Sequence, residues 1–232
     1  MNHGEIDDTL RRAAQAPHEV NPALLDRIAA SIQPSLRPVR PLPPTWVLAG
    51  GLVLICAAVA LAGAARSGFY GLQKLSIFGR ALIFPALAVF VCLAAVACVG
   101  QMIPGSRQHV SPSALLAGGS LALVAVFAIL FHDYQTEHFV SQGLVCLAAG
   151  LLHAIPVALA AWLLLRRGFA VNPVAAGLVT GTLAGLAGVT MLELHCPNFE
   201  APHVMLWHTA VILVSAAAGA LAGRLGHSHR NQ

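Results

Sequence analysis

Residues 173–192 read PVAAGLVTGTLAGLAGVTML and contain no charged side chain. A run of about 18 or more apolar residues is long enough for an α-helix to cross the hydrocarbon core of a bilayer. Five other stretches have the same character, and the six predicted transmembrane segments are 46–65, 81–103, 114–131, 143–165, 173–192 and 204–225. Because these runs are continuous and do not alternate with polar residues, they favour helices over the strands of a β-barrel.

The composition of the whole chain also indicates a membrane protein. Hydrophobic residues make up 57% of the 232 residues, charged residues only 9%, and the mean hydropathy is +0.76. Soluble domains carry roughly 25% charged residues, so this chain could not cover a water-facing surface of ordinary size. The first apolar run begins after about forty polar residues, too late for a signal peptide. We therefore expect an all-α, polytopic bundle of six transmembrane helices with a short cytoplasmic helical segment at its N-terminus.

The Lys and Arg residues are distributed unevenly between the two sides of such a bundle. If the N-terminus is inside, only Arg66, Lys74 and Arg80 of the 13 basic residues fall on the outer side. Because Lys and Arg beside transmembrane helices are retained in the cytoplasm, the pattern predicts that both termini are cytoplasmic. The loops at 133–137 and 193–200 then face outward. The net charge of +4 reflects this topology and does not indicate direct binding to nucleic acid.

The N-terminal segment contains a predicted amphipathic helix. Asn21 is a good N-cap, Pro22 fits the first turn, and Pro34 ends the helix. Between them, apolar residues recur at helical spacing and form one face, made of Leu24, Leu25, Ile28, Ala29 and Ile32. A segment this short cannot build its own core. The face must therefore be covered, either by the lipid surface and the protein's own loops or by the groove of a partner protein.

The residues after this helix form a proline-rich connector. Residues 36–44 read LRPVRPLPP, which is typical of an extended, fairly stiff polyproline-like segment. This gives a domain division into residues 1–44 (cytoplasmic segment and connector), 45–225 (six-helix transmembrane domain) and 226–232 (cytoplasmic tail).

Two of the apolar segments contain rows of small residues. Such rows let helix backbones approach closely in lipid. They are expected to pack helices within the bundle, or alternatively to form a dimer face, so the oligomeric state stays open. The rows are Gly177, Gly181 and Gly185 in the fifth segment and Ser215, Gly219 and Gly223 in the sixth.

Few ionisable side chains are expected at membrane depth. At membrane depth the six segments contain no Asp, Glu, Lys or Arg, since Arg224 lies at the cytoplasmic end of the last one, and this argues against a transporter or a proton pump. His153 and His208 are the candidates, either as packing residues or, in an alternative hypothesis, as haem ligands. Cys56, Cys92 and Cys98 are expected to be small packing residues.

The outward-facing part of the sequence contains the remaining reactive side chains. Cys146 and Cys196 are the two cysteines placed toward the oxidising side, where disulfides persist. A redox-responsive pair, a metal site and no shared function are all compatible with the sequence. For a metal, zinc or a softer ion, the candidate ligands are His195, Cys196 and His203. We find no catalytic triad, Walker loop or dinucleotide motif, and do not expect an enzyme or any other cofactor.

Several of these pieces together resemble a known family. Residues 21–29 read NPALLDRIA and lead into SLRPVRPLP at 35–43. Six apolar segments follow, with ELHCP at 193–197 and Trp207-His208 at the start of the last segment. The whole chain resembles the NrsF family, the "negative regulator of sigma F" anti-sigma factors.

The resemblance implies a bacterial inner-membrane protein that sequesters an extracytoplasmic-function sigma factor and senses stress from outside. Its outward-facing sensor cysteine would be Cys196, with Cys146 as partner. The N-terminal segment would hold the sigma factor through Leu24, Leu25, Ile28, Ile32, Leu36, Arg37 and Arg40. The alternative from another class is a small membrane transporter or metal exporter with a regulatory N-terminal tail.

Overall fold

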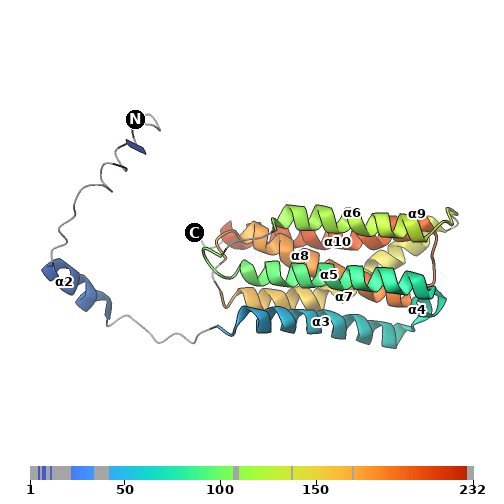
Figure 1. Cartoon of the computed structure of the whole chain (residues 1–232), viewed down its shortest axis with the longest axis horizontal. Helices are drawn as coiled ribbons and strands as arrows, with labels where there is room; N and C mark the ends of the chain where they lie inside the picture. The colour runs from blue at the N-terminus through green and yellow to red at the C-terminus, as the bar shows by residue number, and fades with distance from the viewer. Residues whose placement is uncertain are drawn as a thin grey trace. The chain divides into compact units, whose positions relative to one another are not determined.

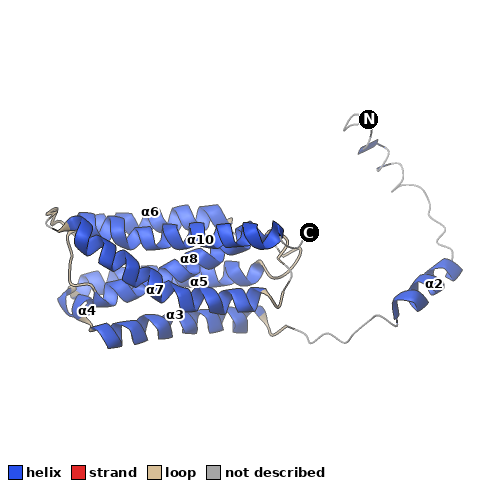
Figure 2. Ribbon diagram, turned by 180° about the vertical axis from the view of Figure 1, so that it is seen from behind, coloured by secondary structure: helices blue, strands red, loops and turns tan. Residues whose placement is uncertain are grey.

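The computed structural model describes residues 22–33, 42–106, 110–136, 138–168 and 170–228, together with Glu5, Asp7, Asp8 and Arg11. The chain divides into two units, residues 1–42 and residues 43–232. Within the described residues the regular structure is helical (Figures 1 and 2).

In the first unit, α2 spans Pro22–Ile32 and confirms the predicted amphipathic helix. None of its residues is buried, and Leu24, Leu25 and Ile28 keep 45–52% of their surface exposed. The expected cap at Asn21 and stop at Pro34 lie outside the described residues, as do Leu36, Arg37 and Arg40.

The second unit contains six helices that are long and apolar enough to cross a membrane, as predicted. Four are α3 (Thr45–Ser67), α5 (Ile77–Gly100), α6 (Pro112–Leu130) and α7 (Phe139–Leu165), with the short α4 (Tyr70–Lys74) after α3. The fifth is α8 (Pro173–His195). The sixth is composite: α9 (Ala201–His203) leads through a π-helical turn, η2 (Val204–His208), into α10 (Thr209–Ser228).

Local sequence explains where several of these helices begin. The Ser76, Ser111 and Asn172 side chains each accept a hydrogen bond from the backbone N–H three residues later, at 3.0–3.1 Å. Each thereby satisfies one of the N–H groups that a helix leaves without an internal partner. Pro112 and Pro173 occupy the first turn, where a missing N–H costs nothing.

Helix α8 is the centre of the bundle. Of its most apolar window 72% is buried, against 22–39% for the other five spans. It packs against α3, α5, α7 and α10. The other helices turn large apolar side chains outward, such as Leu54, Leu121 and Val145, which are 68–70% exposed. In a membrane protein this outer surface contacts lipid.

The rows of small residues pack α8 against α10, which confirms the intramolecular alternative. A Cβ atom at Gly177 would overlap the carbonyl of Gly219, and one at Gly181 would overlap that of Ser215. The two backbones touch at these points, so only residues without a side chain fit.

The other expected packing residues divide into two groups. His153 donates from Nδ1 to the carbonyl of Ala149 at 2.8 Å, as expected of a packing histidine. Cys56 and Cys98 are buried as expected, but Cys92 is exposed on the outside of the bundle. The expectation for Cys92 was wrong because its position on α5 faces away from the neighbouring helices.

Candidate functional site

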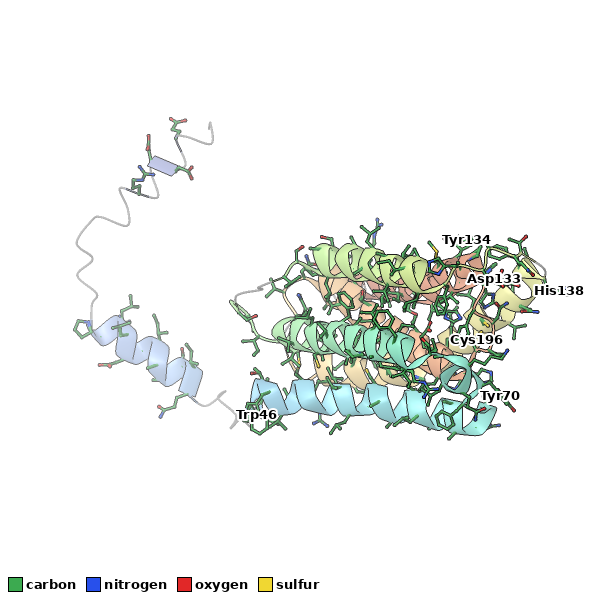
Figure 3. The ribbon with its side chains drawn as sticks, turned by 45° about the vertical axis from the view of Figure 1, so that its right-hand side comes forward. Trp46, Tyr70, Asp133, Tyr134, His138 and Cys196 are labelled. Carbon is green, nitrogen blue, oxygen red and sulfur yellow. The ribbon has the colours of Figure 1, made fainter. Side chains whose placement is uncertain are left out.

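The candidate site lies at the end of the bundle where α8 stops and α9 begins, opposite the start of α3. Figure 3 places Cys196 toward this end and Trp46, in the first turn of α3, at the other. Cys196 follows α8 directly, and its N–H still donates to the carbonyl of Leu192 at 2.7 Å. Helix α4 covers this turn closely, because Gly71 leaves room for the backbone of Glu193 and Cys196.

The site brings the two predicted sensor cysteines together. Cys146 lies in the second turn of α7, and its sulfur is 3.5 Å from the sulfur of Cys196. Both residues are free thiols. A disulfide requires a bond of about 2.05 Å. The pair is therefore in contact but not bonded.

Two buried histidines complete the cluster. His203 Nε2 lies 3.6 Å from the sulfur of Cys196, and His203 and His208 are both fully buried. Their rings meet edge to face with centroids 5.5 Å apart. One sulfur or nitrogen atom from each of four residues lies within 4.8 Å of all the others; the residues are Cys146, Cys196, His203 and His208. We call these four residues the Cys/His cluster.

The π-helical turn explains why His203 and His208 meet. In an α-helix, residues five apart point roughly 140° away from each other, since each turn holds 3.6 residues. A π-helix closes i→i+5 hydrogen bonds, so residues five apart lie nearly over one another. The η2 turn spans Val204–His208 and therefore places both imidazoles on the same side.

A buried carboxylate, that of Glu193, forms a hydrogen bond with His208. The Nδ1 atom of His208 donates to Oε1 of Glu193 at 2.6 Å, and neither side chain is exposed to solvent. A buried carboxylate is costly unless it is paired, which the imidazole provides here. The sequence assigned Glu193 to an outer loop. This was wrong, because α8 continues to His195 and Glu193 lies in its last turn.

The surroundings of Cys196 favour its protonated form. The hydrogen bond with Cys146, followed by burial, raises the pKa of the Cys196 thiol above its ordinary value. His203 and His208 act in the opposite direction but less strongly. At neutral pH, Cys196 is therefore a thiol rather than a reactive thiolate.

A pocket gives access to the two sulfurs. It has a volume of about 390 Å³ and its lining is mainly apolar. The residues around it are Ser141, Gln142, Val145, Cys146, His195, Cys196, Pro197 and Asn198. A small reagent or ion could reach the cysteines through this opening.

The two predicted outer loops pack together beside the cluster. The N–H of Ala201 donates to the carbonyl of Asp133 at 2.6 Å, and the Phe131 and Phe199 rings stack with centroids 5.2 Å apart. The amide of Asn198 also donates to Gln142 on α7 at 2.9 Å. The contact with Gln142 holds the segment that carries Cys196 against the helix that carries Cys146, and the other two hold it against the segment after α6.

Not every predicted ligand joins the cluster. The structure brings Cys196 and His203 together, but Nδ1 of His195 instead contacts the carbonyl of Gly68 at 3.0 Å. Sequence reasoning did not place His208 near Cys196 and His203. In a regular α-helix the side chain of His208 would point away from that of His203. The role of each predicted site residue in sensing or metal binding stays a prediction.

Comparison with known proteins gives the family. Residues 29–226 match the NrsF family, described as negative regulator of sigma F. The chain is also 30% identical over 163 residues to the probable anti-sigma-F factor NrsF of Azospira oryzae, which covers 66% of this chain and 76% of that protein. No solved structure matches the chain significantly. With an all-helical membrane bundle and a match over most of its length, this protein belongs to the NrsF family of anti-sigma factors, the negative regulators of sigma F.

Proposed function

We propose that this membrane protein sequesters an extracytoplasmic-function sigma factor through its N-terminal segment and releases it when a periplasmic redox or metal signal reaches the cysteine pair near Cys196. The observation that carries this proposal is the contact of Cys146 and Cys196 at 3.5 Å, at the end of the bundle opposite the start of α3. One end then receives the signal, and the other end connects to the segment that binds the partner.

The exposed face of α2 supports the partner half of the proposal. Leu24, Leu25 and Ile28 line one side of this helix and remain about half exposed. An isolated 11-residue helix is marginal in water, since most helical stability comes from packing an apolar face. A groove on a sigma factor would provide that packing, in the manner of other helix-in-groove complexes.

The distribution of basic residues supports the orientation, with both termini in the cytoplasm and the protein in the bacterial inner membrane. Arg166 and Arg167 follow α7 at the end of the bundle where α3 starts. At the other end of the bundle, Lys74 donates a hydrogen bond to the carbonyl of Pro197 at 3.3 Å. Arg80 donates one to the carbonyl of Leu75 at 3.0 Å. Lys74 therefore contacts the segment that follows Cys196, whereas Arg80 bonds within its own part of the chain.

A physical route connects the two ends through α3. This helix leads directly to the N-terminal segment and packs against both α7 and α8, which carry the two cysteines at their outer ends. The three helices meet where Gly63 of α3 faces His153 of α7 and Met191 of α8, and a Cβ at Gly63 would come within 2.8 Å of both. A change in spacing between α7 and α8 would therefore reach α3. Release requires two states of the bundle with different affinity for the sigma factor.

A co-purification experiment tests the proposal. The full-length protein is isolated in detergent from cells that contain its cognate sigma factor, then treated with an oxidant or a thiol-binding metal. We expect the wild type to retain the sigma factor until treatment and the Cys146→Ser and Cys196→Ser variants to retain it throughout. Absence of any sigma factor in the untreated preparation would refute the proposal, and equal release from the cysteine variants would refute its sensing half.

A further inference from the structure

We propose that the Cys/His cluster is a tetrahedral metal site for a zinc-type divalent cation, with Cys146, Cys196, His203 and His208 as its four ligands. This deepens the proposed function, because it names the ligand class of the same cysteine pair. Binding of the ion can nevertheless be measured without any sigma factor.

The distances between the donor atoms match those of a tetrahedral zinc site. With zinc–sulfur bonds of about 2.3 Å and zinc–nitrogen bonds of about 2.0–2.1 Å, tetrahedral angles give about 3.8 Å between two sulfurs and about 3.6 Å between sulfur and nitrogen. The two sulfurs lie 3.5 Å apart, and Cys196 Sγ lies 3.6 Å from His203 Nε2. All four donor atoms fall within 4.8 Å of one another. Only small side-chain adjustments would be needed to close the site.

The hydrogen bonding of His208 is that of a metal ligand. Its Nδ1 atom donates to Glu193, while its Nε2 atom is buried without a hydrogen-bond partner among the described residues. Metal-bound histidines typically donate their second ring N–H to a carboxylate, which orients the ring and strengthens the donor nitrogen. A bound ion would satisfy the Nε2 atom. A packing role alone would leave it buried and unsatisfied, which is costly.

The donor set selects the class of ion. Two thiolates and two imidazoles in tetrahedral arrangement suit zinc and similar soft or borderline cations, whereas magnesium and calcium require oxygen ligands. The pocket beside Cys146 and Cys196 provides an entry path. On binding, each thiol loses its proton to water, and an imidazole ligand that is protonated loses one as well, so one ion releases at least two protons. A redox pair by itself would require neither histidine.

The ion would join segments that are distant in the chain. Cys146 belongs to α7, Cys196 to the turn after α8, and His203 and His208 to the start of the last span. Coordination would fix α7 against the end of α8 and against α9 and η2. Removal of the ion, or oxidation of the two sulfurs, would release this link at the outer end of the bundle.

The test uses the full-length protein in detergent, reduced, stripped of metal with a chelator, and titrated with cobalt(II) as the probe. We expect one cobalt per chain, a thiolate-to-cobalt charge-transfer band, the intense visible bands of tetrahedral cobalt, and at least two protons released. Zinc should then displace the cobalt and abolish the colour. A wild-type protein that binds no cobalt, or binds it without the thiolate band, overturns the proposal whatever the variants do.

Matched variants identify the ligands. His208→Gln and Cys146→Ser should weaken cobalt binding at least tenfold and reduce the bands, whereas His132→Gln should bind as the wild type does. His132 is the control because it follows α6 at the same end of the bundle but is exposed and belongs neither to the Cys/His cluster nor to the pocket lining. If His203→Gln and His208→Gln both retain the wild-type spectrum, the four-ligand site is wrong.

A parallel assay of sigma-factor capture by the same preparation separates the two proposals. Capture of the sigma factor without cobalt binding overturns the metal site alone. Cobalt binding without capture overturns the proposed function alone.

Discussion

The apolar face of α2 and the Cys/His cluster are built in opposite ways. Leu24 and Leu25 on α2 are 48% and 52% exposed, whereas His203 and His208 are fully buried and Cys196 is only 3% exposed. The first set lies on one short helix. The second is assembled from α7, the end of α8, and the start of the last span.

This difference indicates what each region requires. All four residues of the Cys/His cluster belong to the bundle, which fits a site for a small reagent or ion. Helix α2 buries none of its residues, so its apolar face gains stability only when another surface covers it. In the function proposed above, one region would sense a small reagent or ion and the other would bind the sigma factor.

The largest expected effect comes from charged substitutions on the apolar face of α2. Leu25→Asp with Ile28→Asp should abolish capture of the sigma factor by the full-length protein. Burial of two such side chains contributes roughly 3–6 kcal/mol, so affinity should fall at least a hundredfold. Pull-down from a lysate with quantified sigma factor measures the change.

The matched control is Ala23→Asp with Ala30→Asp, which adds the same charge to the opposite, exposed side of α2. Affinity within threefold of wild type is expected for this control. If both double variants bind equally well, the α2 face is not the interface.

The second prediction concerns the helix packing that supports the Cys/His cluster, and a smaller effect is expected there. Gly181→Leu should destabilise the protein by about 3 kcal/mol or more, because its side chain would overlap the α10 backbone at Ser215 and Ala216. Thermal unfolding in detergent measures the change. Gly118→Leu on α6 is the control, since nothing lies within 4 Å of a Cβ there. Equal melting temperatures for the two variants would contradict the close α8–α10 packing.

The third prediction concerns the buried acid beside the Cys/His cluster. Glu193→Gln should lower stability by about 1.5–3 kcal/mol, the usual contribution of a hydrogen bond to a charged group. The same substitution at the partly buried Glu200 should change stability by less than about 0.5 kcal/mol. Thermal unfolding with a chelator present provides the comparison. An unchanged Glu193→Gln protein would mean that the 2.6 Å contact with His208 contributes nothing.

The smallest effect is a pH dependence at the cysteine pair. Because the hydrogen bond with Cys146 raises the pKa of Cys196, less thiolate is present at a given pH and alkylation should be slow up to the ordinary thiol pKa of about 8.5. In Cys146→Ala this hydrogen-bond partner is removed, so the alkylation midpoint should shift to lower pH. Mass spectrometry of chelator-treated protein follows the modification of Cys196. A midpoint that stays in place or rises would contradict the assigned cause.

Much of the fold could be predicted from local sequence. Continuous apolar runs located all six spans, although α5 begins four residues earlier than expected, at Ile77, and the last span begins three residues earlier, at Ala201. These shifts arise because Arg80 and His203 interrupt the apolar runs, whereas the helices continue through both residues. The α2 stripe was equally readable, since it depends only on spacing along one helix.

The candidate site was only partly predictable. Cys146 and Cys196 were paired because few cysteines lay toward the outer side, and the structure brings them into contact. His195 was chosen because it adjoins Cys196 in the chain, but neighbouring residues at a helix end point in different directions. His208 was not chosen because only a π-helical turn brings it beside His203.

The sequence by itself determined that this chain forms six transmembrane helices and an amphipathic N-terminal helix, because hydrophobic length and periodicity are properties of single segments. The tertiary structure decided that Glu193 meets His208 and that four donor atoms converge within 4.8 Å. Such distances depend on the depth and rotation of several helices. These are set by backbone contacts at residues such as Gly71 and Gly181, which no single segment can reveal.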